Sequence, residues 1–225
     1  AAYLPSEMLQ LVSVVSLNQE FTAPQIYDST SSEVNALSSA GFPTDFSVSF
    51  DVYYTDGMDS VKGLVEIRAG GSCYLSIVSQ SANRIFLYHL FDLSASPHDG
   101  LLSYSGSLSY NNNAWNRILV TWDGSSHKLY LNGNEYSVTT HLYGGTDFTW
   151  DESFTSISIG YYNVNHGAFN FANKIGYVNI YYSVVDVADI SGGRRLDESI
   201  GPRLTMSPCT ERDCDNTDCG ANTIC

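Results

Sequence analysis

The segment that most restricts the fold covers residues 115–133, with the sequence WNRILVTWDGSSHKLYLNG. Apolar and polar residues alternate on both sides of Asp123-Gly124, which is the pattern of half-buried β-strands. Asn132-Gly133 is typical of a two-residue type I′ hairpin turn, because both central positions need a positive φ. The segment predicts a three-stranded meander, with Trp115 and Trp122 available to the core.

The same alternation recurs along the chain, between clusters of Gly, Asn, Asp and Ser that favour turns. In one run, Cys73, Leu75 and Ile77 are expected on one face, and Tyr74 and Ser76 on the other. No window keeps a helical apolar period for three turns. The chain is therefore predicted to be all-β, an antiparallel two-sheet sandwich or jelly roll. The other alternating runs are residues 46–52, 118–122, 129–131, 157–159 and 178–180.

Charge and hydropathy argue against two classes of partner. The formal net charge is −14, which would repel the phosphate backbone of a nucleic acid. There is no uncharged apolar run of about 18 residues or more, so no membrane-spanning helix is predicted in this segment. An acidic surface suits calcium, a basic partner or simple solubility.

Four of the five cysteines crowd the end of the chain, at Cys209, Cys214, Cys219 and Cys225, while Cys73 stands alone. Such density in an acidic chain indicates disulfides formed in an oxidising, extracellular compartment. A zinc site is the alternative, but no histidine and no C-x2-C pair lies there. Residues 191–208 are rich in Gly and mixed charge and are predicted to be a linker.

The meander resembles that of laminin-G-like, or concanavalin-like jelly-roll, domains. The resemblance covers about residues 40–190, with residues 1–39 as a leading strand and loop, and it implies a domain over residues 1–190. Its motifs are Trp115, then TWDG at 121–124 and LYLNG at 129–133, and later SIG at 158–160, IGYVNIY at 175–181 and VADI at 187–190.

The tail at residues 209–225 resembles the start of an epidermal-growth-factor-like module, which makes it a short disulfide-rich appendage. That resemblance implies a bond between Cys214 and Cys225, and a partner for Cys219 beyond the last residue. Cys209 is then left over. It either pairs with Cys73, or Cys73 stays a buried free thiol.

Catalytic patterns are missing from the sequence, so the chain is predicted not to be an enzyme. Related sandwich hydrolases carry Glu-x-Asp-x-Glu, whereas Glu66 stands alone here with Arg68 on the same face. No G-x-S-x-G elbow surrounds any serine. His89 is interpreted as a core residue and His127 as a surface residue of the meander.

Calcium is the one cofactor that the sequence suggests. Two loops carry pairs of aspartates, Asp56 with Asp59 and Asp147 with Asp151, and calcium takes carboxylate and loop carbonyl oxygens. The alternative is that these aspartates only form turns. Ser72 stands where calcium-binding laminin-G-like domains often carry an aspartate, which counts against a site.

Paired tyrosines are the candidate binding surface, because one of each pair faces outward from a strand. They are Tyr53 with Tyr54, Tyr161 with Tyr162, and Tyr181 with Tyr182. Two functions remain open: a non-catalytic extracellular adhesion or assembly module, and a lectin that is either calcium-dependent or not. The expected partners are other extracellular or cell-surface proteins, copies of the chain itself in a filament or matrix, or glycans.

Overall fold

The computed structural model describes residues 13–55, 61–70, 72–80, 83–92, 99–143, 153–161 and 174–191. The chain divides into two units, residues 1–193 and 194–225. The second unit lies outside the described residues. The predictions for the linker, the tail and its disulfide therefore stay predictions.

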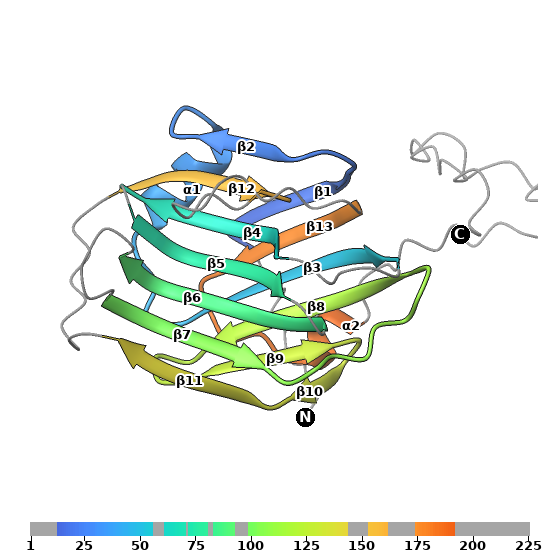
Figure 1. The fold of residues 1–225 in the computed structure, drawn as a ribbon. Helices are drawn as coiled ribbons and strands as arrows, with labels where there is room; N and C mark the ends of the chain where they lie inside the picture. Colours follow the sequence, from blue (N-terminus) through green and yellow to red (C-terminus); the bar gives the residue numbers. More distant parts are fainter. Residues whose placement is uncertain are drawn as a thin grey trace, which may run out of the picture. The chain divides into compact units, whose positions relative to one another are not determined.

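Two antiparallel sheets form the first unit, and sheet B lies in front of sheet A in Figure 1. Sheet A has the strand order β1-β13-β3-β8-β9-β10, and sheet B the order β11-β7-β6-β5-β4-β12-β2. This arrangement confirms the predicted all-β jelly-roll sandwich. The strands of sheet A are β1 (Val15–Phe21), β3 (Phe46–Tyr54), β8 (Ala114–Trp122), β9 (His127–Leu131), β10 (Asn134–Tyr136) and β13 (Lys174–Tyr181). Those of sheet B are β2 (Gln25–Asp28), β4 (Lys62–Ala69), β5 (Ser72–Gln80), β6 (Arg84–Asp92), β7 (Asp99–Ser105), β11 (Val138–Tyr143) and β12 (Phe154–Ile159).

The core lies between the sheets and is filled by alternate residues of each strand. Phe50 of β3 pairs with Ile118 of β8, and both side chains are buried. Ile77 of β5 and Leu87 of β6 meet them from sheet B in the same apolar cluster. Burial of these alternating positions removes apolar surface from water, which is the main favourable contribution to folding.

The predicted meander is confirmed as β8, β9 and β10. Asn132 and Gly133 join β9 to β10 with positive φ angles of 51° and 85°. The loop after β8 is held by Asp123, whose carboxylate accepts bonds from the backbone N–H groups of Ser125 and Ser126. These bonds, with that from the Ser125 hydroxyl as the largest cause, hold the pKa of Asp123 well below its usual value.

The predicted side-chain directions of Trp115 and Tyr74 were wrong. Trp122 is 9% exposed and lies in the core, but Trp115 is half-buried on the outer face of sheet A, against Tyr53. The two tryptophans are an odd number of positions apart, so a regular strand directs them to opposite faces. Tyr74 also belongs to the core, because a β-bulge against β4 adds one residue to β5 at that point.

A short helix, α1 (Ser32–Ala40), was not predicted. The hydroxyl of Ser31 accepts a bond from the N–H of Val34 and caps its first turn, and Gly41 at φ 79° ends it. Val34 and Leu37 are its buried residues. The helix is too short to show three turns of apolar period, which is why the pattern was missed.

Part of the outer face of sheet A, around Leu119 and Tyr181, is covered by residues 183–191, which end in helix α2 (Val187–Ser191). Arg117 of β8 donates two bonds to the Asp51 carboxylate, at 2.7 and 2.9 Å, and a third to the carbonyl of Ile190 at 2.6 Å. These bonds to Asp51 are the main cause of the raised pKa of Arg117. One guanidinium therefore joins two strands to the segment that closes this face.

Candidate functional site

The outer face of sheet B is defined by one line of paired residues that crosses five strands. Glu66, Ser76, Tyr88, Leu102 and His141 are successive partners from β4 to β11. Partners in an antiparallel sheet point to the same side. The neighbouring line runs through Val65, Ile77 and Leu87, which are buried in the core, so the line that begins with Glu66 faces outward.

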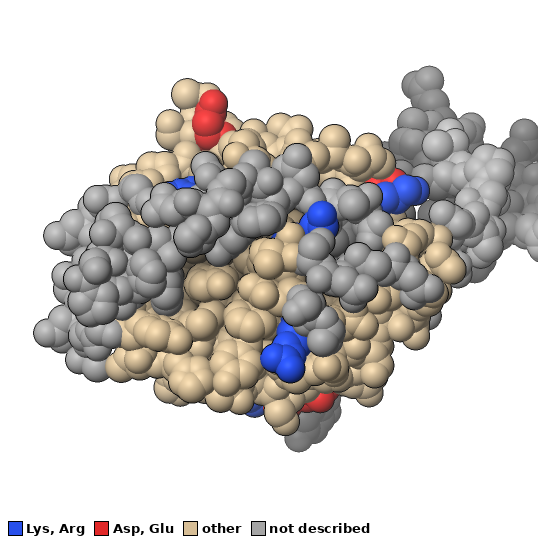
Figure 2. Space-filling model, in the orientation of Figure 1, with Lys and Arg blue, Asp and Glu red and all other residues tan. Residues whose placement is uncertain are grey.

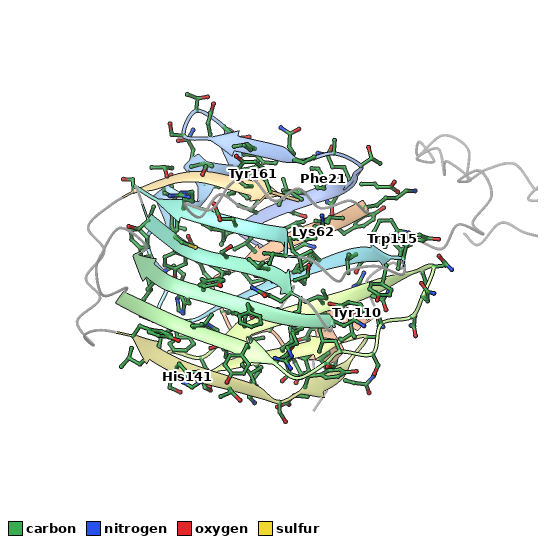
Figure 3. The ribbon with its side chains drawn as sticks, viewed as in Figure 1. Phe21, Lys62, Tyr110, Trp115, His141 and Tyr161 are labelled. Atoms are coloured by element: carbon green, nitrogen blue, oxygen red, sulfur yellow. The ribbon has the colours of Figure 1, made fainter. Side chains whose placement is uncertain are left out.

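Three rings form a continuous strip on this face, which we call the aromatic row. Phe86 of β6 stacks on Tyr104 of β7 at 5.5 Å between ring centroids, and Tyr104 stacks on His141 of β11 at 5.4 Å. The Tyr104 hydroxyl lies 3.1 Å from Nε2 of His141. Phe86 and Tyr104 are half-buried and His141 is exposed. Figure 3 labels His141 on β11, at the lower edge of sheet B.

Arg84 lies on the same face as the aromatic row, two positions before Phe86 on β6, and its side chain is exposed. The guanidinium of Arg84 has no hydrogen-bond or ion-pair partner within the described part of the chain. Figure 2 shows this face: its visible described part is largely uncharged, with isolated basic groups and no acidic group in the middle. The row therefore combines apolar ring surface with one free cation.

Glu66 is the acidic residue in the line of paired residues that crosses this face. Glu66 is buried; Arg68 donates to it at 3.4 Å, as the sequence suggested, and the Ser76 hydroxyl at 3.4 Å. Cys73 lies beside them as a buried free thiol. Burial, and then the nearby Glu66 carboxylate, raise the pKa of this thiol. Cys209, the alternative partner of Cys73, lies outside the described residues, so a bond between these two cysteines stays a prediction.

A buried histidine pair lies on the inner side of the same strands. The rings of His89 and His127 are 5.1 Å apart, and both pack against Trp122. His127 was predicted at the surface but is buried, because its pairing with Trp122 in β8 directs it inward. Nδ1 of His89 and Nε2 of His127 have no hydrogen-bond partner in the described structure.

The chemistry of this pair is set by burial. Burial lowers the pKa of His127 to about 4, against a weaker opposite effect of Asp123, and lowers that of His89 well below its usual value. Both rings are therefore neutral at neutral pH. Ser103 lies 2.8 Å from Nδ1 of His127, a distance at which a base activates a nucleophile. Ser103 is fully buried, however, so no substrate reaches it and the contact is structural.

The six tyrosines predicted as a binding surface do not form one surface. Tyr54 is buried in a stack with Tyr110, and Tyr181 is buried under residues 183–191, so neither is an exposed contact. Tyr182 donates its hydroxyl to the carbonyl of Leu37.

Tyr53 and Tyr161 are half-buried, and Tyr162 lies outside the described residues. Tyr53 lies under Lys174, whose ammonium is 5.7 Å from its ring centroid. Trp115, the ring partner of Tyr53, belongs to β8 of sheet A and is labelled at the right in Figure 3, whereas His141 belongs to β11 of sheet B and is labelled at the lower left. The aromatic row was missed because its members come from three strands, and the register between strands is not visible in the sequence.

The predicted calcium ligands Asp56, Asp59, Asp147 and Asp151 all lie outside the described residues, as do Cys209, Cys214 and Cys225. Within the described ranges, no group of three or more His, Cys, Asp or Glu side chains is arranged to hold a metal. No helix in those ranges is long and apolar enough to cross a membrane.

Comparison with protein families identifies the chain. Residues 28–191 match the family model Laminin_G_3, described as the concanavalin A-like lectin/glucanases superfamily. The match covers more than half of the chain, so the chain belongs to this superfamily, as the motifs of the meander indicated. No curated protein sequence matches the chain.

Solved structures share the fold at low sequence identity. The CBM40 of the Ruminococcus gnavus IT-sialidase bound to alpha2,3 sialyllactose is 12% identical with a TM-score of 0.58, over 80% of this chain and 98% of that one. Its complex with alpha2,6 sialyllactose is 13% identical with a TM-score of 0.57, over 79% and 99%. The K499G mutant of the NanB sialidase from Streptococcus pneumoniae is 11% identical with a TM-score of 0.59, but the match covers 80% of this chain and only 28% of that enzyme.

Proposed function

We propose that this domain is a non-catalytic carbohydrate-binding module that holds a glycan on the outer face of sheet B. The aromatic row carries this proposal. Partly exposed rings give an apolar surface for the C–H groups of a pyranose, while the Tyr104 hydroxyl and the His141 imidazole bond its hydroxyl groups. Three adjacent strands position the rings, so the row is rigid before a ligand binds.

The proposed ligand class is a glycan that ends in an acidic sugar. The free guanidinium of Arg84 lies at one end of the aromatic row, and arginine binds a carboxylate with two parallel hydrogen bonds. The Ruminococcus gnavus CBM40, which shares this fold, is described as bound to sialyllactose, a sugar with a carboxylate. Net charge opposes an acidic ligand, so its recognition needs this local cation.

The test is calorimetric titration with sialyllactose and with lactose, which lacks the carboxylate. Tyr104→Ala is expected to weaken binding of both sugars about tenfold or more, because it removes the central ring. Arg84→Gln is expected to weaken only sialyllactose by a similar factor. Tyr53→Ala, which alters an aromatic side chain on sheet A, is the matched control and leaves both affinities unchanged. Loss of binding in the Tyr53 variant and not in the Tyr104 variant would refute the assignment to sheet B.

Absence of turnover is part of the proposal. Incubation with sialyllactose is expected to release neither free sialic acid nor lactose, as chromatography of the products would show. Release by the purified chain would show that it is an enzyme.

An extracellular location, calcium dependence and the growth-factor-like module stay predictions. Peptide mapping without reductant tests the bond between Cys214 and Cys225.

A further inference from the structure

Strand β11 is the outermost strand of sheet B and lies at the lower edge of the molecule in Figure 1. It pairs only with β7 among the described strands, so one side of its backbone has no strand beside it. All its residues after Val138 are exposed, and Leu142 is 49% exposed. A free edge of this kind is able to pair with another strand.

Charge distinguishes β11 from the other described sheet edges. The edge strand β1 contains Glu20, β2 contains Asp28 and β10 contains Glu135, whereas β11, with the sequence VTTHLY, has no acidic or basic side chain other than a histidine. It also lacks proline and lysine, which protect free edges in many proteins. Two copies that each carry a net charge of −14 repel each other, so an uncharged edge is where they can approach.

We infer that β11 pairs with β11 of a second copy of this chain, antiparallel and around a two-fold axis perpendicular to sheet B. Such pairing of identical strands is symmetric by construction. An axis through Thr140 places Val138 opposite Leu142 of the second copy, and the reverse contact follows from the symmetry. Val138 and Leu142 are on the same side of the strand, so each covers apolar surface of the other copy.

The pairing has a consequence for the aromatic row, which rests on the proposed glycan function. A two-fold axis perpendicular to the sheet keeps both outer faces on the same side. His141 belongs both to the aromatic row and to β11, so the two rows lie beside each other across the new pair of strands. The dimer then holds two glycan sites that face one surface, and a branched or clustered glycan binds both with a higher effective affinity.

The dimer is expected to be weak. A pair of six-residue strands buries less than the roughly 1,200 Å² that stable interfaces bury at the least. Each backbone hydrogen bond contributes only about 1 kcal/mol net to the association. The dimer therefore dissociates on dilution, and its fraction rises with protein concentration.

Sedimentation velocity of the full chain without glycan, over a series of protein concentrations, tests the pairing. Wild type is expected to change from monomer to dimer as concentration rises. Leu142→Lys places a charge on the edge and is expected to raise the dimer dissociation constant about tenfold or more. The matched control is Ile26→Lys, since Ile26 is 50% exposed on the other edge of the same sheet, and this variant dimerises like wild type.

Circular dichroism checks that both variants fold. A wild type that stays monomeric at every concentration would overturn the inference, and so would a Leu142→Lys variant that dimerises as wild type does. An equal loss in the Ile26→Lys variant would show that β2, not β11, is the contact. The measurement uses no sugar, so it fails or succeeds independently of the glycan titrations.

Discussion

The buried pair of His89 and His127 is expected to make the fold sensitive to mild acid. The pKa of His127 falls from 6.5 in the unfolded chain to about 4 in the folded protein because of burial. Between these two values the unfolded chain binds a proton that the folded protein does not. The contribution of His127 to the free energy of unfolding is therefore complete above pH 6.5 and is lost as the pH falls towards 4.

The magnitude follows from the size of the pKa shift. A fall from 6.5 to about 4 corresponds to about 3 kcal/mol at about 1.4 kcal/mol per pKa unit. His89 acts in the same direction, since burial lowers its pKa as well. A loss of about 3 kcal/mol is a large part of the 5–15 kcal/mol that stabilises a typical domain, so a marked fall in the free energy of unfolding is expected in mildly acidic buffer.

The assay is urea unfolding at a series of pH values between 7 and 4, followed by the fluorescence of the three tryptophans, one of which, Trp122, has its ring 4.5 Å from that of His127. In the His127→Gln variant the free energy of unfolding should fall less steeply with decreasing pH, by about 1.4 kcal/mol per pH unit. His127 also contributes to the lowered pKa of His89, so the difference in slope reports the loss of His127 together with its effect on His89. Equal slopes for wild type and variant would refute the assignment of a buried, neutral His127.

Three further changes test the fold. Trp122→Ala should cost about 3–5 kcal/mol in urea unfolding, while Trp115→Ala on the outer face should cost much less; equal costs would contradict the opposite directions of the two side chains. Arg117→Ala leaves the carboxylate of Asp51 buried without its partner and should cost about 3–5 kcal/mol; a change below about 1 kcal/mol would show that residues 183–191 are held by other contacts. The thiol of Cys73 should react with a maleimide only after denaturation, as mass spectrometry of the labelled peptides would show; rapid labelling of the native protein would mean that β5 is accessible.

The sequence predicted the local structure that depends on neighbouring residues. Alternation of apolar and polar residues is a property of a single strand, so it identified β3, β8, β9, β12 and β13 before their partners were known. Asn132-Gly133 specified its turn through the backbone angles that the two residues tolerate. The motifs of the meander then led to the superfamily that the family comparison confirmed.

Tertiary structure alone decided what depends on pairing between distant strands. A β-bulge directs Tyr74 into the core, although the sequence placed it on the face opposite Leu75. Pairing with Trp122 buries His127, although the sequence placed it at the surface. The paired tyrosines were visible in the sequence, but they do not form one surface, because neighbouring residues on a strand point to opposite faces of the sheet. The aromatic row was invisible for the converse reason. Phe86, Tyr104 and His141 are far apart in the chain, and only the register of β6, β7 and β11 brings their rings together.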